Sequence, residues 1–468
     1  ARLRLALCAV LACAAPQPAL ALAPTPQFET LGVEHGLPST RVYEVVSDRA
    51  GFLWIATAEG LARYDGVGFA VWRHDPADPA SLPANDVQTV FVDREDRVWL
   101  GSVDGGLSML DEARRVLRTW RGGEGGLSGT DVWAIAQGPD GAIWAGTYNG
   151  GLNRLDPATG QQGTLRHRAD DPRSIATDII TNLRIYQRGR LWNGTSEGLG
   201  ILDNGAAADG SGPVQQFLPG QMVTSLRESA DGTIWVGVRD GVHRIGDDGQ
   251  VVKVALPESL LVEAVEEDAQ GRRWYATRRG LLLEHAPGVF APFRREPGRA
   301  WTLPSNTLID ALRDREGGLW FPAFEGGLVH VKPQWPNFSL LRPAPRDGRP
   351  ADDERVRTVS LCADGSVLAN GPRGSLLRYD PVGGADVRID PPWPGGAGPS
   401  SVLAVLCARD GAYWIAHREG VTRHDPRDGT LRTWRQGADD GIAAGLVDLL
   451  HEDDDGRVWA SVLGSVLE

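Results

Sequence analysis

Residues 42–65 read VYEVVSDRAGFLWIATAEGLARYD, and this pattern decides the fold. An alternating apolar segment is followed by a turn rich in Asp and Gly, a segment that contains Trp54, a second turn at Gly60, and a third apolar segment. The pattern returns as VQTVFVDREDRVWLGSVDGGLSMLD at 87–111 and as VWAIAQGPDGAIWAGTYNGGLNRLD at 132–156. Alternation with a period of two is typical of β-strands. Each copy therefore predicts a small antiparallel sheet.

The tryptophan in this pattern marks successive copies along the chain. It recurs at Trp54, Trp99, Trp144, Trp192, Trp235, Trp274 and Trp320, with spacings of 45, 45, 48, 43, 39 and 46 residues. Leu368 takes its place in the next copy, and Trp414 and Trp459 follow. A repeat of roughly 40–50 residues without helical periodicity is typical of one four-stranded blade of a β-propeller. We therefore predict an all-β chain, with a seven-bladed β-propeller followed by an incomplete second β-propeller.

The strand boundaries follow from the first copy. The four predicted strands are Val42–Ser47, Phe52–Thr57, Leu61–Tyr64 and Phe69–Trp72. A segment of the fourth-strand type, Phe28–Leu31, precedes the first copy, and residues 338–341 have the same form. We predict that each ring begins with the fourth strand of its own last blade, because pairing the two chain ends removes exposed sheet edges. A loop motif such as DPASLPAND at 78–86 is predicted to carry the chain between blades.

The domain prediction combines the repeats with the N-terminus. Arg2 and Arg4 precede an apolar run at 5–15 and the small residues Ala19-Leu20-Ala21, which is the pattern of a cleaved export signal. A lipoprotein box ending at Cys13 is the alternative. We predict a signal peptide at 1–21, a first propeller at 22–335 and a partial second propeller of about three blades at 336–468. Because seven blades need roughly 315 residues, we expect this sequence to be a fragment of a longer, periplasmic polypeptide.

Two cysteines outside the signal region, Cys362 and Cys407, occupy similar positions in successive repeats. A disulfide requires Cα atoms within about 7 Å of each other. We expect strands of neighbouring blades to hold these positions farther apart, and so predict two buried, unpaired thiols. A disulfide is the alternative in an oxidising compartment.

Several functional classes lack their signals. The formal net charge is −13 and no basic stripe is present, which argues against nucleic acid. The nine histidines form no metal-binding motif, and we find no cofactor-binding signature. The segment SADGTIW at 229–235 resembles the Asp-box of sialidase-like enzymes, but Asp231 and Gly232 are adjacent there. No catalytic residue and no metal ligand are therefore predicted in this segment.

The strand order places the turn between the second and third strands of every blade on one face of the ring. The side chains at these turns are Glu59, Asp104, Tyr148, Asn149, Glu197, Arg239, Asp240, Arg278, Arg279, Phe324 and Glu325. Loops on a rigid scaffold commonly carry binding groups, so we predict a ligand site among them, suited to a sugar or an acidic oligosaccharide. Asp, Asn and Glu before Gly also simply form hairpin turns.

The units GFLWIATAEGLARYDG, RVWLGSVDGGLSMLD and AIWAGTYNGGLNRLD resemble the two-component regulator propeller repeat, from about Gln27 to the C-terminus. The resemblance implies a periplasmic sensor with two propellers, a β-sandwich module, one transmembrane helix and a cytoplasmic output domain. That output is a histidine kinase or a diguanylate cyclase, and many such kinases sense polysaccharide breakdown products. It also implies a homodimer in the intact receptor, anchored in the membrane by a downstream segment. A secreted glycan-acting propeller enzyme, sialidase- or lyase-like, and a protein-interaction scaffold are the alternatives.

Overall fold

The structure is a computed structural model that describes residues 25–337 and 356–467, with short gaps. The gaps are 112, 125, 161, 187–188, 204–212, 247, 299–300, 372–373, 381–385, 397, 400, 438–441, 443–444 and 463–464. The predicted signal peptide, the box at Cys13 and the predicted strand at 338–341 lie outside the described residues. The chain divides into two compact units: Pro26–Pro297 with Trp301–Trp335 forms the first, and the second contains Pro336–Glu468.

The first unit consists, in the residues described, of seven four-stranded antiparallel sheets, called blades 1 to 7 below. Blade 1 is β2 (Val42–Ser47), β3 (Leu53–Thr57), β4 (Gly60–Tyr64) and β5 (Phe69–Trp72); blade 2 is β6 (Val87–Val92), β7 (Val98–Ser102), β8 (Gly106–Leu110) and β9 (Val116–Trp120). Blade 3 is β10 (Val132–Gln137), β11 (Ile143–Thr147), β12 (Gly151–Leu155) and β13 (Gln162–Leu165); blade 4 is β14 (Ile180–Tyr186), β15 (Arg190–Thr195), β16 (Gly198–Leu202) and β17 (Val214–Phe217). Blade 5 is β18 (Val223–Glu228), β19 (Ile234–Val238), β20 (Gly241–Ile245) and β21 (Val251–Val254); blade 6 is β22 (Val262–Glu267), β23 (Arg273–Thr277), β24 (Gly280–Ala286) and β25 (Val289–Phe293).

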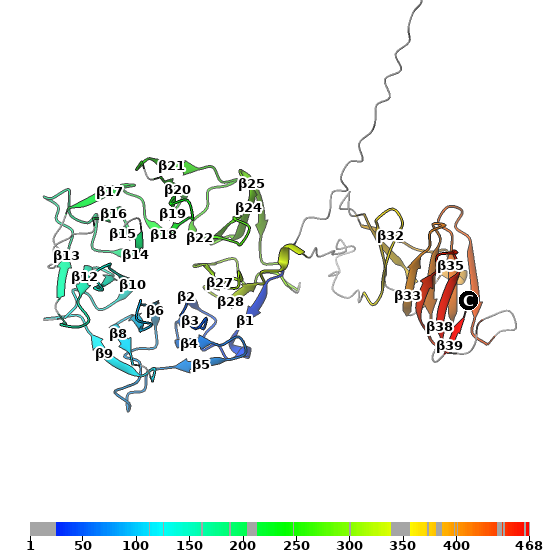
Figure 1. Cartoon of the computed structure of the whole chain (residues 1–468), viewed down its shortest axis with the longest axis horizontal. Coiled ribbons are helices and arrows are strands. Elements are labelled where there is room, and N and C mark those ends of the chain that lie inside the picture. The colour runs from blue at the N-terminus through cyan, green and yellow to red at the C-terminus, as the bar shows by residue number, and fades with distance from the viewer. Residues whose placement is uncertain are drawn as a thin grey trace, which may run out of the picture. The chain divides into compact units, whose positions relative to one another are not determined.

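Blade 7 joins the two ends of the first unit. It contains β26 (Leu312–Arg313), β27 (Leu319–Ala323), β28 (Gly327–Val331) and, from the start of the chain, β1 (Glu29–Leu31). β1 pairs with β28 in antiparallel register, with Thr30 opposite Val329. The predicted ring closure by the N-terminal strand is therefore confirmed. From blade 1 to blade 7 the first strand of each blade contacts that of the next blade, and β27 of blade 7 contacts β2 of blade 1. The blades surround a common centre (Figure 1).

The repeated tryptophans fill the space between neighbouring blades. Trp54 of blade 1, fully buried, packs in one cluster with Val87 and Leu100 of blade 2. A large aromatic surface at a fixed position lets each blade bury a face that it cannot bury alone. The Asp of the preceding turn holds the ring in place: the Oδ2 of Asp48 accepts a hydrogen bond from Nε1 of Trp54 at 2.9 Å, and its Oδ1 accepts two backbone N–H groups. The same pair recurs at Trp99, Trp274, Trp320 and Trp459.

The interblade loops behave as the sequence predicts. The side chain of Asn85 accepts the backbone N–H of His74 at 2.7 Å, and Asn306 does the same for Arg295. The unusual Asn193-Gly194 pair does not interrupt blade 4, because β15 continues through both residues and Asn193 donates a hydrogen bond to the carbonyl of Gly200.

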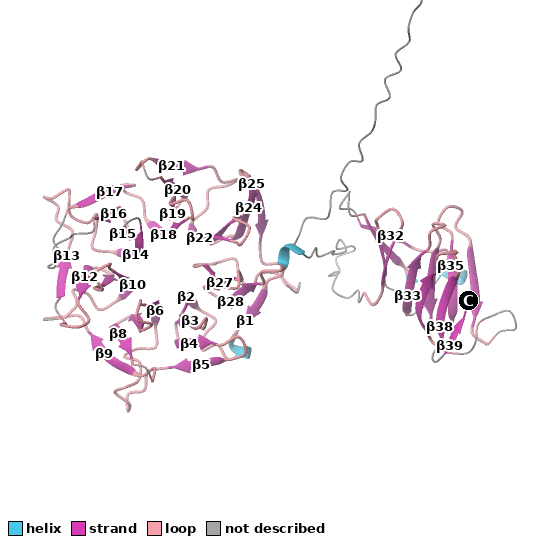
Figure 2. Ribbon diagram, viewed as in Figure 1, coloured by secondary structure: helices cyan, strands magenta, loops and turns pink. Residues whose placement is uncertain are grey.

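The second unit continues the same repeat. It contains the sheets β29 (Val359–Leu361), β30 (Val367–Asn370), β31 (Leu376–Tyr379) and β32 (Asp386–Ile389), then β33 (Val402–Cys407), β34 (Tyr413–His417), β35 (Gly420–His424) and β36 (Leu431–Arg435), then β37 (Val447–Glu452), β38 (Val458–Val462) and β39 (Ser465–Leu467). Leu368, which replaces the tryptophan, is fully buried. The helical segments found in the described residues are the short 3-10 turns η1 (Val33–His35), η2 (Trp335–Asn337) and η5 (Pro394–Gly396) (Figure 2). None of the helices described is long and apolar enough to cross a membrane.

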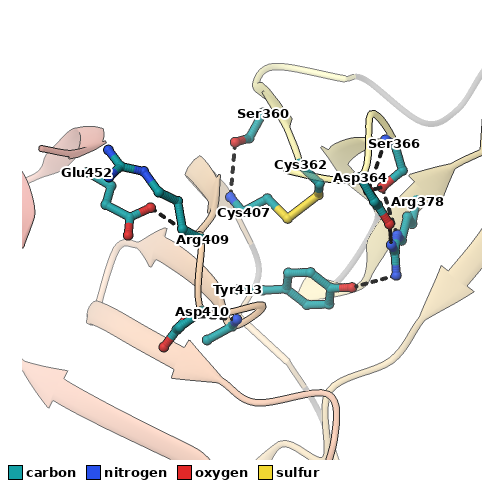
Figure 3. Close-up of a disulfide and its surroundings, with 11 residues drawn as sticks. Ser360, Cys362, Asp364, Ser366, Arg378, Cys407, Arg409, Asp410, Tyr413 and Glu452 are labelled. Carbon is teal, nitrogen blue, oxygen red and sulfur yellow. Dashed lines mark hydrogen bonds and ion pairs between the residues drawn. A yellow bond between two sulfur atoms is a disulfide. The ribbon is translucent and has the colours of Figure 1, made fainter. Parts of the chain in front are cut away.

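The prediction of two unpaired thiols is wrong, because Cys362 and Cys407 form a disulfide (Figure 3). Their Cα atoms are 5.1 Å apart. Cys362 directly follows β29 and Cys407 ends β33, so the bond joins the first strands of neighbouring blades. These two strands are also linked by a hydrogen bond from the backbone N–H of Cys407 to the Oγ of Ser360, at 2.9 Å. The two cysteines are closer than predicted because the first strands of neighbouring blades lie against each other.

Candidate functional site

The predicted turn residues lie at the turns between the second and third strands of each blade, and most are exposed. Asp104 and Asn149 adopt left-handed backbone conformations, with φ of 54° and 67°, and so serve the turns themselves. Asp240 pairs with Lys253 at 2.8 Å, and Arg279 pairs with Glu258 at 2.6 Å. These contacts occupy several of the charges that were predicted to bind a ligand.

A second set of residues lies near the start of the first strand of the blades. The alternating strand pattern of the sequence did not predict these residues. In blades 1 to 6 a β-bulge occurs there, as between Val42 and Glu44. A bulge leaves one extra residue unpaired and redirects its side chain. The bulge residues are Tyr43, Gln88, Trp133, Thr181, Thr224 and Glu263. The sequence does carry a signal: buried apolar residues here are three apart, as in VYEV and VQTV, instead of two.

The bulge residues line one mouth of the axial channel, around a cavity of about 170 Å³. Two of the predicted turn residues, Tyr148 and Phe324, contact them. The rings of Tyr148 and Trp133 are 4.6 Å apart, and those of Phe324 and Tyr43 are 6.4 Å apart. Aromatic side chains therefore occupy the mouth on the side of blades 7, 1 and 3. On the opposite side, in blades 4 to 6, the bulge residues are polar.

Arg278 is the turn residue most closely tied to the mouth. Its Nε lies 2.6 Å from Oε1 of Glu263, a bulge residue whose side chain is only 11% exposed. Burial raises the pKa of Glu263, and the hydrogen bond from Arg278 acts against that shift. The pair thus neutralises a carboxylate that the channel mouth would otherwise hold at a cost.

The two neighbouring arginines are expected to respond differently to substitution. Arg278→Ala should lower Tm at neutral pH, with a loss of stability of about 1 kcal/mol, because Glu263 loses its partner. Arg279→Ala should leave Tm nearly unchanged, because Glu258 keeps Arg294 at 2.7 Å. Thermal unfolding monitored by circular dichroism measures both. The difference in Tm between the two variants should disappear in acid, where Glu263 is protonated in either protein. Equal losses of Tm at neutral pH would contradict the pairing of Arg278 with Glu263.

A larger cavity of about 600 Å³ occupies the channel beyond the mouth. It is lined by the central and last residues of the first strands, with apolar walls that include Val46, Phe91 and Ile185. A layer of charged side chains lines both cavities and so lies between them. We call this the charged layer: Glu44, Arg184, Arg227, Glu266 and Asp310.

The charged layer joins blades on opposite sides of the ring. Nη2 of Arg184, from blade 4, lies 3.6 Å from Oε1 of Glu44 in blade 1. Nη2 of Arg227 lies 2.6 Å from Oε1 of Glu266 in the next blade. Asp310 accepts the backbone N–H of Val45 at 3.2 Å. Its burial in the channel, reinforced by the negative charge of Glu44, raises the pKa of Asp310 to about 7.

Comparison with known proteins supports the repeat and the fold. Residues 126–149 match the family Two component regulator propeller. The extracellular domain of a proposed hybrid two component system, BT3049 of B. thetaiotaomicron, superposes with a TM-score of 0.69 at 20% identity, covering 94% of this chain and 59% of that one. The corresponding domain of BT4673 from the same organism gives a TM-score of 0.56 at 18% identity, covering 94% and 58%.

A third solved structure shares the fold with a different printed activity. Streptogramin B lyase superposes with a TM-score of 0.51 at 13% identity, covering 66% of this chain and 97% of that one. At such identities the likeness concerns the fold alone. The curated proteins give no match.

The chain spans about three fifths of the length of the two Bacteroides domains. Its blades are the four-stranded antiparallel sheets of a propeller, and the matched segment contains β10 and β11 of blade 3. The resemblance found in the repeats is thereby confirmed for residues 126–149, which match a two-component regulator propeller repeat, and the likeness over the rest of the chain is one of fold.

Proposed function

We propose that this chain is the exported, ligand-sensing propeller region of a transmembrane signalling receptor. The observation that carries the proposal is the combination of the matched repeat at 126–149 with a likeness over 94% of the chain to extracellular domains of proposed hybrid two component systems. In this proposal the chain binds an oligosaccharide or another periplasmic ligand or partner. It carries no catalytic centre and no cofactor of its own.

The finer organisation of the receptor is part of the same proposal. The segment 22–335 is a complete seven-bladed propeller and 336–468 begins a second one, whose remaining blades follow. The protein is a homodimer held in the inner membrane by a segment beyond these residues, and its output domain is a histidine kinase or a diguanylate cyclase. The ring supports this role physically: a closed ring presents its turns and its channel as a rigid site, and so suits recognition.

Two experiments test the proposal. The gene beyond the codon for Glu468 is expected to encode further blades, a transmembrane helix and a kinase or cyclase domain. An alkaline phosphatase fused after Trp335 should be active in the periplasm, and the matched fusion that lacks residues 1–21 should not be. A gene that ends after the second ring would refute the receptor role and favour a secreted enzyme or a scaffold. A fusion that keeps residues 1–21 and is as inactive as the fusion without them would refute export, because alkaline phosphatase becomes active only where its disulfides can form.

A further inference from the structure

The axial channel of the first unit is amphipathic across its width. In blades 1 to 6 the fourth residue after the start of the first strand lines the larger cavity, and in blade 7 Leu312, the first residue of β26, does so. The seven blades can therefore be compared at these positions. Blades 7, 1, 2 and 3 place apolar side chains there, namely Leu312, Val46, Phe91 and Ala136. Blades 4, 5 and 6 place Arg184, Arg227 and Glu266 there. One side of the channel can therefore contact a hydrocarbon group while the other contacts charges.

Some polar atoms of the charged layer lack a hydrogen-bond partner among the described residues, whereas others are fully paired. Glu266 is occupied, because it receives Arg227 and the backbone N–H groups of Glu267 and Arg313. The distance of 3.6 Å between Arg184 and Glu44 is too long for a hydrogen bond. The Nε of Arg227 is buried with no hydrogen-bond partner among the described residues, which costs free energy.

The free groups have both signs of charge. The guanidinium side chains of Arg184 and Arg227 are 34% and 35% exposed, so both reach the cavity. Glu44, which is 16% exposed, presents its Oε1 on the opposite side of the channel, because its Oε2 already accepts hydrogen bonds from the Thr89 hydroxyl and the backbone N–H of Val90. The carboxyl group of Asp310 lines the cavity beside it. Donors and acceptors thus face each other across a space large enough for a small molecule.

The charges of the layer are nearly balanced. Two arginines face Glu44 and Glu266, and Asp310 adds no charge while it is protonated. A ligand with a net charge would leave that charge without a partner in a half-buried site, which is costly. A ligand that carries one positive and one negative group, each aligned with the opposite sign in the layer, avoids this cost.

We propose that the larger cavity binds a small zwitterion with an apolar tail, of the α-amino acid or short-peptide class. Its carboxylate lies against Arg184 and Arg227, its ammonium group against Glu44 and Asp310, and its side chain against Val46, Phe91 and Leu312. The cavity volume of about 600 Å³ is within the range of small-molecule sites. The inference deepens the proposed sensing role and rests on it, because it names the ligand class of the first unit.

The test uses three matched probes with the full chain, by isothermal titration calorimetry at about pH 6, where Asp310 is protonated. L-Leucine has both charges, 4-methylpentanoate lacks the ammonium group, and 3-methylbutylamine lacks the carboxylate. L-Leucine is expected to bind at least about tenfold more tightly than either analogue, since each loses a charge-assisted hydrogen bond.

Substitutions connect the binding to the layer. Arg184→Gln should weaken L-leucine binding by about tenfold or more, because Gln keeps a hydrogen-bonding amide but no positive charge. Arg173→Gln, at a side chain 73% exposed on the outside of the ring, is the matched control and should bind as the parent protein does. Circular dichroism of both variants verifies that the fold is retained.

The inference is overturned if none of the three probes binds the parent chain, or if 4-methylpentanoate binds as tightly as L-leucine. Equal binding to the Arg184→Gln variant would also overturn it. These outcomes leave the receptor role intact if the gene still encodes a membrane helix and an output domain. Conversely, L-leucine binding to a secreted protein without such domains would refute the receptor role and keep the ligand assignment.

Discussion

Loss of the Cys362–Cys407 disulfide is expected to lower the free energy of unfolding of the second unit by about 4 kcal/mol. The two cysteines are 45 residues apart in sequence, so the bond closes a long loop in the unfolded chain and removes much of its conformational entropy. The bond also joins β29 to β33, where Cys362 packs with Leu368, Val402 and Tyr413. The Cys362→Ala, Cys407→Ala double variant, unfolded in urea, measures the effect.

The first unit provides an internal control, since the described part of it contains no cysteine. A reducing agent should shift the unfolding transition of the second unit in the parent chain and leave that of the double variant in place. The transition of the first unit should not move in either protein. A double variant whose second unit unfolds at the urea concentration of the parent would show that the disulfide contributes nothing to stability.

Most of the blade architecture could be predicted from the sequence, because the strands obey local rules. The predicted strands Val42–Ser47 and Phe69–Trp72 match β2 and β5, and the others in blade 1 differ by one residue at one end. Alternation, glycine turns and the tryptophan period are all properties of neighbouring residues. The closure by Phe28–Leu31 was also predictable, because an unpaired strand at the start of a repeat array needs a partner.

The site was only partly predictable, because it depends on contacts between distant blades. The turn residues Arg278 and Tyr148 could be placed on one face from strand order alone. Their contacts with Glu263 and Trp133 depend on the bulges, which strict alternation conceals. The 3.6 Å approach of Arg184 to Glu44 joins blades 140 residues apart in sequence. No local pattern carries that information, and the same is true of the disulfide geometry.

Asp310→Asn is expected to stabilise the first unit above neutral pH and to have little effect near pH 4. Asp310 has a folded-state pKa of about 7, raised from the ordinary value of 3.8. Between these values the folded chain holds a proton that the unfolded chain releases, so this group's contribution to stability falls as pH rises from 3.8 to 7 and is then constant. The full cost is on the order of 4 kcal/mol.

Asn is a suitable replacement because its side-chain oxygen can still accept the backbone N–H of Val45, while it never ionises beside Glu44. The Tm of the variant, relative to that of the parent chain, should therefore increase through the window from 3.8 to 7 and level off above it. Asp170→Asn, on an exposed loop, should show no such trend. If Asp310→Asn were instead most destabilising above pH 7, ionised Asp310 would be acting as a partner of Arg184, and the charged layer would hold three ionised carboxylates against two arginines.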